Sequence, residues 1–597
     1  MASWVIAGCG LQAVELGVAE DGRGAGVGPV VVGDVDEVVV AQLMAAEPAA
    51  EPDARLRWTE PLGELALPAN VAPLTFVWRS GDGLPLPPEP GAPPEPGGAA
   101  PPEPPMPMAP GMPMGPRGRS TPSAAESDEL AIGFVLLVRS ESEELLRIYT
   151  AEHGVIPPVE RWRPLLASQV GHVLEVELRA LYMPSGLVVR SAPLQIEVRA
   201  ATPQGALFAY SIRARGIVSA GLEQPRSSVL ASPASESGCV GCHSVSRDGS
   251  RILAAVSGEP GVRQSELPGR ELTALSVDAG GAAVDYVFGS YDPTGARVAL
   301  SLAGALYIVD ANSGETLDVK RWPGSLVTQP DWSPLGDVIA VSLSADEPGK
   351  KAASSDIARV KVQRDGRLGE PELIASDAAP RDVQRLFPSY SPDGGWIAFE
   401  QRMGKGRDEQ NGSLRLLASD GGESLVLARV AAAPELADGW PSWMPGANAD
   451  QPWLLFNSSR AAYGGMLEPG RRQLYASAID LPLAAAGRDP SLGAFHLPFQ
   501  DPAGSYRHVA WAPSENSCVS QREQCDERDD DCDTRIDEDC CSPQPERCDE
   551  AGDEDCDGSY DEGCSCLLRD VCMDDTDDDC DGKIDEQPCS AAPKAMP

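Results

Sequence analysis

Aromatic residues and histidines are scarce in this chain. Phe, Trp and Tyr make up 5% of its 597 residues, and there are five histidines. Three common enzyme signatures are absent: the H-E-x-x-H of zinc hydrolases, the G-x-S-x-G elbow of serine hydrolases and the Walker A phosphate loop. These absences favour a protein that is not an enzyme, although loops can build an active site without any such motif.

Basic residues and long apolar runs are also lacking. The 48 Lys and Arg are outnumbered by 90 Asp and Glu, a net charge of −42, which argues against a nucleic-acid partner because phosphates require a basic surface. The same charge is unsuited to docking on anionic lipid. The best apolar run, Leu130 to Val138, is shorter than the roughly 18–20 residues of a membrane span. We therefore expect any membrane attachment to be through a lipid anchor.

Glycine and proline are abundant, at 60 and 56 residues, and favour strands and turns over long helices. Residues 84–122 form a Pro-rich, low-complexity segment that we expect to be extended and solvated. Its methionines have thioethers that bind Cu(I), but such short repeats also arise by slippage. These methionines are Met106, Met108, Met112 and Met114.

The cysteines indicate the compartment. Twelve of the fifteen lie in residues 514–597, which also carry a net charge of −22. So dense a set is typical of a disulfide framework, and disulfides persist in an oxidising compartment. The sequence therefore predicts an exported protein.

The N-terminal segment, residues 1–54, contains a second sign of export. Trp4-Val5-Ile6-Ala7-Gly8-Cys9 resembles the cleavage box of a bacterial lipoprotein, whose cysteine is lipidated. Only eight residues precede Cys9, fewer than the basic and apolar regions of a signal require, and a start codon assigned too far downstream would explain this. We expect either a lipidated Cys9 or an unremarkable cysteine.

Residues 55–204 predict a β-sandwich. Short segments of period-2 alternation, bounded by Pro and Gly, indicate antiparallel strands, and residues 81–124 are a Pro-rich insertion between them. The segments around Leu67, Trp78 and Trp162 resemble Ig-like or fibronectin-like modules, in which both tryptophans are core residues. The predicted strands are 74–78, 132–138, 174–178, 187–189 and 194–198.

Residues 205–513 repeat themselves. A strand leads into a Pro-x-Gly turn, where glycine takes a positive φ, and an apolar strand follows. The copy at Asp331-Trp332-Ser333-Pro334-Leu335-Gly336 aligns with Ser389-Tyr390-Ser391-Pro392-Asp393-Gly394. Weaker copies begin near Ser246, Tyr291, Pro441 and His508. Such units at 40–60-residue spacing predict a β-propeller of about six blades.

The W-S-P-D-G-x-x-I-A type of motif is similar to the TolB-like, WD-related propeller repeat, over roughly 270 residues. We expect residues 207–212 to close the blade that begins at His508, since closure of the ring removes exposed strand edges.

The first constellation with chemical potential is Cys239-Val240-Gly241-Cys242-His243. Its C-x-x-C-H spacing is that of c-type haem attachment, in which two thioethers hold the vinyl groups and the histidine binds iron. A Cys239–Cys242 disulfide and another metal remain alternatives. The sixth iron ligand would have to come from the propeller, if there is one, and the candidates are Met403, Met444, Met466, His496 and His508.

The second constellation is the tail, residues 514–597, which contains three copies of a four-cysteine unit with an acidic loop. The units look like the Cys/Asp-rich metal-binding repeats of bacterial surface proteins, and Asp-x-Asp-x-Asp is how an EF-hand loop wraps oxygens around Ca²⁺. A disulfide-held acidic stalk without metal, and zinc on free thiolates, are the alternatives. The expected calcium ligands are Asp529, Asp531, Asp533, Asp537, Asp553, Asp555, Asp557, Asp561, Asp577, Asp579, Asp581 and Asp585.

The sequence as a whole predicts a mainly β protein: an Ig-like sandwich, a propeller and a disulfide-rich tail. We expect an envelope protein, periplasmic or on the outer surface, or a secreted one, with covalent haem c for electron transfer or redox sensing and with Ca²⁺ in the tail. Its partners would be envelope or surface proteins, including a redox partner. The alternative is a protein- or glycan-binding propeller without haem, and a propeller lyase or glycosidase is a third possibility.

Overall fold

The structure is a computed structural model, and the chain divides into two units, residues 1–515 and 516–597. All described residues belong to the first unit. Cys9, Cys239, the Pro-rich segment and the calcium ligands expected in the tail lie outside them. The described residues are 13–15, 30–32, 35–81, 129–202, 204–233, 240–256, 262–267, 273–275, 288–345, 354–363, 366–375, 383–403, 412–430, 437–446, 450–461, 465–466, 471–501 and 504–513.

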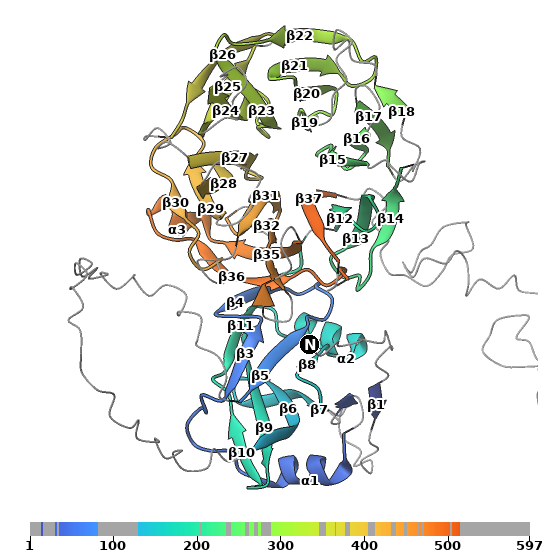
Figure 1. The fold of residues 1–597 in the computed structure, drawn as a ribbon, viewed down its shortest axis with the longest axis vertical. Helices are drawn as coiled ribbons and strands as arrows, with labels where there is room; N and C mark the ends of the chain where they lie inside the picture. Colours follow the sequence, from blue (N-terminus) through green and yellow to red (C-terminus); the bar gives the residue numbers. More distant parts are fainter. Residues whose placement is uncertain are drawn as a thin grey trace, which may run out of the picture. The chain divides into compact units, whose positions relative to one another are not determined.

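The described part of residues 1–204, here called the N-terminal module, contains two sheets and two helices (Figure 1). The larger sheet has the order β1-β2-β7-β6-β9-β11-β4, with β10 beside β9, and the smaller has the order β3-β5-β8. The elements are β1 (Ala13–Glu15), β2 (Val30–Val32), α1 (Glu37–Ala45), β3 (Leu56–Glu60), β4 (Leu65–Pro68), β5 (Phe76–Ser80), β6 (Leu130–Ser140), β7 (Glu143–Thr150), β8 (Gly154–Val155), α2 (Val159–Ser168), β9 (Val173–Met183), β10 (Leu187–Arg190) and β11 (Leu194–Arg199).

The core of this module lies between the two sheets. Trp78 of β5 and Trp162 of α2 are 1% and 0% exposed, which confirms that both are core residues. Helix α1 covers the opposite face of the larger sheet, where Val39 and Leu43 pack on β6 and β9. Five predicted strands are present with shifted ends, but β2 with β7 and β11 with β4 pair in parallel, because a period-2 pattern shows which face a residue occupies and not the direction of the partner.

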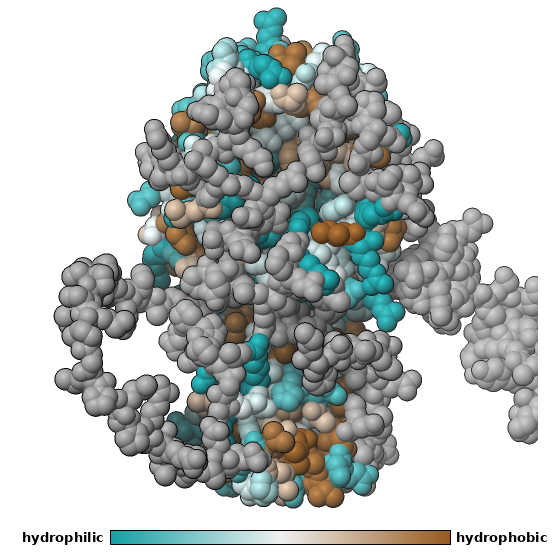
Figure 2. Space-filling view, viewed as in Figure 1, coloured by the Kyte–Doolittle hydropathy of each residue, from teal (hydrophilic) through white to brown (hydrophobic). Residues whose placement is uncertain are grey.

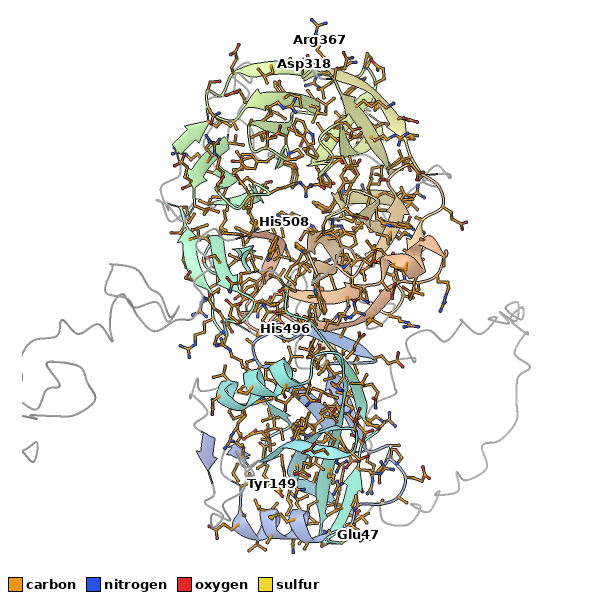
Figure 3. The ribbon with its side chains drawn as sticks, turned by 180° about the vertical axis from the view of Figure 1, so that it is seen from behind. Glu47, Tyr149, Asp318, Arg367, His496 and His508 are labelled. Atoms are coloured by element: carbon orange, nitrogen blue, oxygen red, sulfur yellow. The ribbon has the colours of Figure 1, made fainter. Side chains whose placement is uncertain are left out.

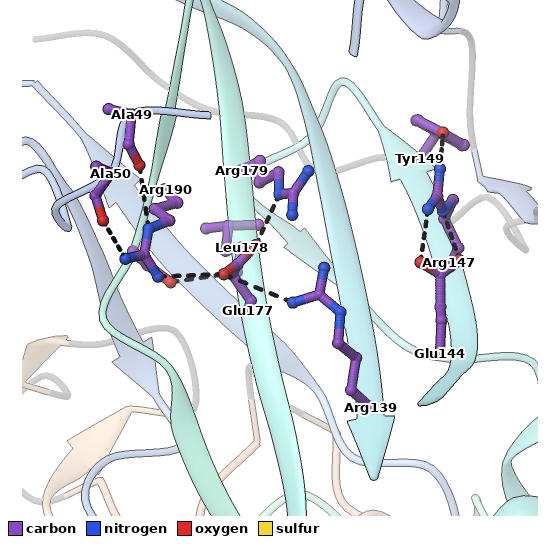
Figure 4. Close-up of polar contacts among 11 residues, drawn as sticks. Ala49, Ala50, Arg139, Glu144, Arg147, Tyr149, Glu177, Leu178, Arg179 and Arg190 are labelled. Atoms are coloured by element: carbon purple, nitrogen blue, oxygen red, sulfur yellow. Dashed lines mark hydrogen bonds and ion pairs between the residues drawn. The ribbon is translucent and has the colours of Figure 1, made fainter. Parts of the chain in front are cut away.

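A buried carboxylate organises the middle of the larger sheet (Figure 4). Glu177 of β9 is 4% exposed and forms ion pairs with Arg139, Arg179 and Arg190, at 3.7, 2.6 and 3.4 Å. Arg190 also donates to the backbone carbonyls of residues 49 and 50. The carboxylate therefore connects three strands and the segment that follows α1.

Several exposed apolar side chains of this module lie on α1 and β10, where Figure 2 shows a brown area. They include Val38, Met44 and Leu187, which are 63%, 55% and 43% exposed. None of the described helices is long and apolar enough to cross a bilayer.

The rest of the unit is a ring of four-stranded antiparallel sheets around a channel (Figure 1). Among the described residues, three of these sheets are separate, two are joined by a bridge between β25 and β27, and the last continues the larger sheet of the N-terminal module through β36 and β4. The innermost strands of neighbouring sheets contact each other around the ring. This radial arrangement is a β-propeller. The strands that follow β11 are β12 (Gly205–Ser211), β13 (Gly216–Gly221), β14 (Ser228–Ala231), β15 (Val240–Val245), β16 (Arg251–Val256), β17 (Val262–Glu266), β18 (Thr273–Leu275), β19 (Phe288–Tyr291), β20 (Arg297–Leu302), β21 (Ala305–Asp310), β22 (Thr316–Lys320), β23 (Ser325–Trp332), β24 (Val338–Ala345), β25 (Ser355–Val362) and β26 (Leu368–Leu373).

The remaining elements complete the ring. A short hairpin, β33 with β34, and helix α3 lie within the last sheet's connections. The elements are β27 (Val383–Tyr390), β28 (Trp396–Met403), β29 (Ser413–Ala418), β30 (Leu425–Val426), β31 (Asp438–Met444), β32 (Trp453–Ser458), β33 (Arg460–Ala461), β34 (Gly465–Met466), β35 (Gln473–Ile479), α3 (Leu481–Ala485), β36 (Ser491–His496) and β37 (Tyr506–Pro513).

The ring closes as the sequence predicts. Strand β37 pairs antiparallel with β12, almost 300 residues earlier, so the two ends of the ring share one sheet. The predicted turn glycines also adopt positive φ, for example +71° at Gly295, +85° at Gly336 and +75° at Gly394. Closure and turn chemistry are therefore both confirmed.

The N-terminal module and the ring share a core. Strand β4 pairs in parallel with β11 on one side and, at Leu65 with Gly493, with β36 on the other. One hydrophobic cluster includes Phe134 and Ile196 of the module together with Leu455 and Phe495 of the last ring sheet.

Candidate binding site in the channel

The innermost strands of the ring sheets carry equivalent residues. These strands are β15, β19, β23, β27, β31 and β37. In each, one residue lies five positions before the proline of the turn motif or, in the copy at 242–247, five positions before Arg247. All six line one cavity in the channel, and we call them the axial residues. They are Cys242, Phe288, Gln329, Phe387, Trp440 and His508.

Four axial residues have a left-handed backbone, with φ of +49° at Cys242, +54° at Gln329, +53° at Phe387 and +53° at Trp440. The ladder to the second strand of the sheet shifts register at each of them, so each is in a β-bulge. Residues other than glycine rarely adopt this conformation. Backbone outliers of this kind gather at functional sites.

The sequence explains why the bulges form at these positions. In three of the bulges the next residue is a proline, Pro330, Pro388 or Pro441. Because proline has no backbone N–H, the interrupted ladder leaves no donor at that position without a hydrogen-bond partner. Gln329 also fixes its neighbour, because its Oε1 accepts a hydrogen bond of 2.9 Å from the backbone N–H of Phe387. Sequence reasoning singled out Cys242 and His508 as candidate haem residues but missed the other four axial residues, although their fixed offset from the turn motif was a signal that could have found them.

The aromatic axial residues close the channel at one level. Phe387 and Trp440 stack with ring centroids 4.0 Å apart, and Phe288 lies 6.0 and 6.1 Å from them. Phe288 and Trp440 come from opposite sheets of the ring, so their contact crosses the channel axis. The ring of His508 lies 5.9 Å from that of Trp440. We call these four residues, Phe288, Phe387, Trp440 and His508, the aromatic floor.

A cavity of about 320 Å³ lies against the aromatic floor, a size within the range of small-molecule sites. Its wall includes polar residues two positions after the axial residues. We call this set the polar belt: Ser244, Ser290, Asp331, Ser389 and Ser442.

Two imidazoles lie at the floor: His243, which is buried, and His508, which is partly buried. His243 is 2% exposed, and its ring centroid is 4.8 Å from that of His508, which Figure 3 places inside the ring. Burial lowers the pKa of His243 to about 4 and that of His508 to about 3, where the neighbouring His243 lowers it further. Both imidazoles are therefore neutral at pH 7.

Arg247 and Asp331 are the charged side chains among the residues that line the cavity. The Asp331 carboxylate accepts hydrogen bonds from Tyr390 N at 2.7 Å and Ser290 Oγ at 3.3 Å. Burial raises its pKa, although Arg247 opposes the shift. Burial lowers the pKa of Arg247, whose Nη2 donates to the carbonyl of Trp332 at 2.7 Å.

The described part of the C-x-x-C-H motif, residues 240–243, does not fit haem in this arrangement. Cys242 lines the cavity, but the Nε2 of His243 donates to the carbonyl of Phe208 at 2.9 Å, and the aromatic floor fills the adjacent axis. The other ring nitrogen, Nδ1, has no hydrogen-bond partner among the described residues. Because Cys239 lies outside these residues, haem attachment stays a prediction.

Only His508, among the candidate distal ligands whose side chains are described, lies beside His243. Met403 is 68% exposed, Met444 is a core residue at 0%, and His496 packs against Tyr475. Figure 3 shows His496 apart from His508. In the described part of the chain, no three His, Cys, Asp or Glu side chains are grouped as a metal site.

Comparisons with known proteins return no matching family model and no matching curated protein. Among solved structures, the chain is similar to a putative TolB from Agrobacterium tumefaciens, with 15% identity over 53% of this chain and 100% of that one and a TM-score of 0.30. It is also similar to a chain of a nidogen/laminin complex (10% identity, 52% and 98% coverage, TM-score 0.34). A third is Kuenenia stuttgartiensis hydrazine synthase (16% identity, 40% and 62% coverage, TM-score 0.26).

Proposed function

We propose that this protein is a binding protein of the cell envelope, built as a six-bladed propeller, whose ligand site is the cavity between the aromatic floor and the polar belt. The N-terminal module serves as a sandwich-type support of the Ig-like kind. In this role the site holds its ligand and does not transform it.

One observation carries this proposal. Six strands that are far apart in the sequence direct their equivalent residues to the same axis, and four of these residues keep a costly left-handed backbone. Strain of about 1–2 kcal/mol at each non-glycine position is expected where the surrounding structure uses the resulting geometry. Here the result is a cluster of aromatic rings that lines the same cavity as four serine hydroxyl groups and one carboxylate, which is the mixture of apolar and convergent polar groups typical of ligand sites.

A fragment screen by ligand-observed NMR tests the proposal. Ala510 lines the cavity, and Ala510→Trp is designed to fill it. Ala201→Trp places the same side chain at an exposed position and serves as the matched control. We expect fragments that bind the unmodified chain and Ala201→Trp but not Ala510→Trp, and a screen without such fragments would refute the binding role.

Covalent haem c, with a role in electron transfer or redox sensing and a redox partner, is the second candidate. It is favoured by the position of Cys242 on the cavity wall. It would require His243 to release the carbonyl of Phe208 and the aromatic floor to open. Haem staining after denaturing electrophoresis of protein made with c-type maturation decides, with Cys239→Ser as control. No stain and no Soret band would leave the Cys239–Cys242 disulfide as the preferred interpretation.

Export, lipidation of Cys9 and calcium in the tail are further parts of the proposal, and they are supported by the sequence alone. The tail would act as a calcium-stabilised, disulfide-rich attachment to envelope or surface proteins. Calorimetric titration of the oxidised full chain with Ca²⁺ tests the ion. We expect a heat signal that disappears when Asp553, Asp555 and Asp557 are changed to Asn together with the equivalent residues of the other two loops.

A further inference from the structure

The charged groups of the cavity define a class of ligand. Arg247 and Asp331 lie close together, because the guanidinium binds the carbonyl of Trp332, the residue after Asp331. They nevertheless form no ion pair with each other within 4.0 Å, and in the described part of the chain that carbonyl is the one hydrogen-bond partner of Arg247. Most of the donors of this guanidinium thus remain available to a ligand.

The carboxylate is in a similar state. Each oxygen of Asp331 accepts one hydrogen bond, from Ser290 Oγ or Tyr390 N, while a carboxylate has about four acceptor sites. Neither partner carries a charge. Burial disfavours the charged forms of both Asp331 and Arg247, so opposite charges brought by a ligand would offset the cost of burying these two groups.

The balance of charge excludes simple ions. Because the lining holds one negative and one positive side chain that attract each other, with both imidazoles neutral, a ligand with a single charge would pair with one group and repel the other. A ligand with both charges satisfies the two groups at once. The aromatic floor is then left to contact an apolar body.

We propose that the cavity binds a small zwitterion of the α-amino-acid type, with its ammonium at Asp331, its carboxylate at Arg247 and a large apolar or aromatic side chain on the aromatic floor. This inference rests on the proposed binding function. A volume of about 320 Å³ accommodates a single amino acid of this kind.

Titration of the unmodified chain with three probes tests the proposal without any substitution. The probes are L-phenylalanine, phenethylamine, which lacks the carboxylate, and 3-phenylpropanoate, which lacks the ammonium. We expect L-phenylalanine to bind about tenfold or more tightly than either analogue, since each hydrogen-bonded charge contributes roughly 1.5–3 kcal/mol. Equal affinity of all three probes would overturn the assignment.

Two variants then locate the charges. Asp331→Asn should weaken L-phenylalanine about tenfold and leave 3-phenylpropanoate unweakened, whereas Arg247→Gln should weaken L-phenylalanine and leave phenethylamine unweakened. Arg226→Gln, at an exposed arginine outside the cavity, should change none of these affinities. If one of these variants still unfolds cooperatively but binds none of the three probes, the assigned pairing is contradicted.

The outcomes separate this inference from the function on which it rests. The zwitterion assignment fails, and the binding role stands, if L-phenylalanine does not bind at about 1 mM while neutral fragments still bind the unmodified chain but not Ala510→Trp. If no fragment makes that distinction, both fail.

Discussion

A single buried carboxyl group makes the stability of the unit sensitive to alkaline pH. Glu60 ends β3 and is 4% exposed; burial raises its pKa to about 8, although Arg460 lowers it. The folded state therefore holds this proton more tightly than the unfolded chain, so stability is lost as pH rises from about 4.5 to 8. Glu60→Gln should raise the free energy of unfolding at pH 8 by on the order of 4 kcal/mol, measured by urea denaturation, and flatten the pH dependence of that free energy. Glu64→Gln, at an exposed position nearby, is the control and should do neither.

The imidazole of His508 produces the opposite dependence. Its pKa in the folded state is about 3, against 6.5 for an ordinary histidine, so the unfolded chain binds more protons below pH 6.5 and stability is lost as pH falls. At pH 5 this costs roughly 2 kcal/mol. We expect His508→Phe to retain more of its neutral-pH stability at pH 5 than the original chain does, measured by thermal unfolding at both pH values. His172→Phe, at an exposed histidine, should behave like the original chain.

At the scale of the strand–turn–strand element, two turn glycines with similar backbones should respond differently to the same substitution. Gly336 and Gly249 have φ of +85° and +74°. A Cβ on Gly336 would meet its nearest atom, Cγ of Pro293, at 3.7 Å, whereas a Cβ on Gly249 would collide with the carbonyl oxygen of Pro513 at the end of β37. Gly336→Ala should therefore cost only the backbone strain, about 1–2 kcal/mol.

Gly249→Ala should cost clearly more than Gly336→Ala, because the closing strand must also move. Denaturation midpoints of the two variants, measured side by side, check the difference. Equal losses would show that β37 yields easily at this contact.

The elements also show what the sequence could and could not predict. Pro-x-Gly turns located the hairpins, and the segment from Leu207 was correctly assigned to the closing sheet, because turn chemistry and alternation are local properties. The bulges at Phe387 and Trp440 were missed because a bulge depends on register with a neighbouring strand. Likewise, the spacing of Cys242 and His243 indicates possible haem attachment but not that the imidazole binds the carbonyl of Phe208.

At the scale of the whole molecule, ring closure should dominate cooperativity. Strand β37 supplies the innermost strand of the sheet that contains β12, and it contributes His508 to the floor. A chain that ends at residue 513 should therefore keep the thermal unfolding transition of the propeller. A chain that ends at residue 504, only nine residues shorter, should lose it. Near-ultraviolet circular dichroism and limited proteolysis of the two truncations check this, and retention of a sharp transition in the shorter chain would contradict it.

The double pairing of β4 determines where the chain can be divided. This strand lies between β11 and β36, and Phe134, Leu455 and Phe495 belong to one apolar cluster that spans the junction. In a recombinant propeller that starts at residue 205, the propeller's part of that cluster would be exposed to water, and we expect the protein to self-associate. Moving the propeller onto a different partner domain, in the laboratory or in evolution, therefore requires that β4, β6 and β11 are kept with it, or that the apolar side chains of the junction are replaced by polar ones.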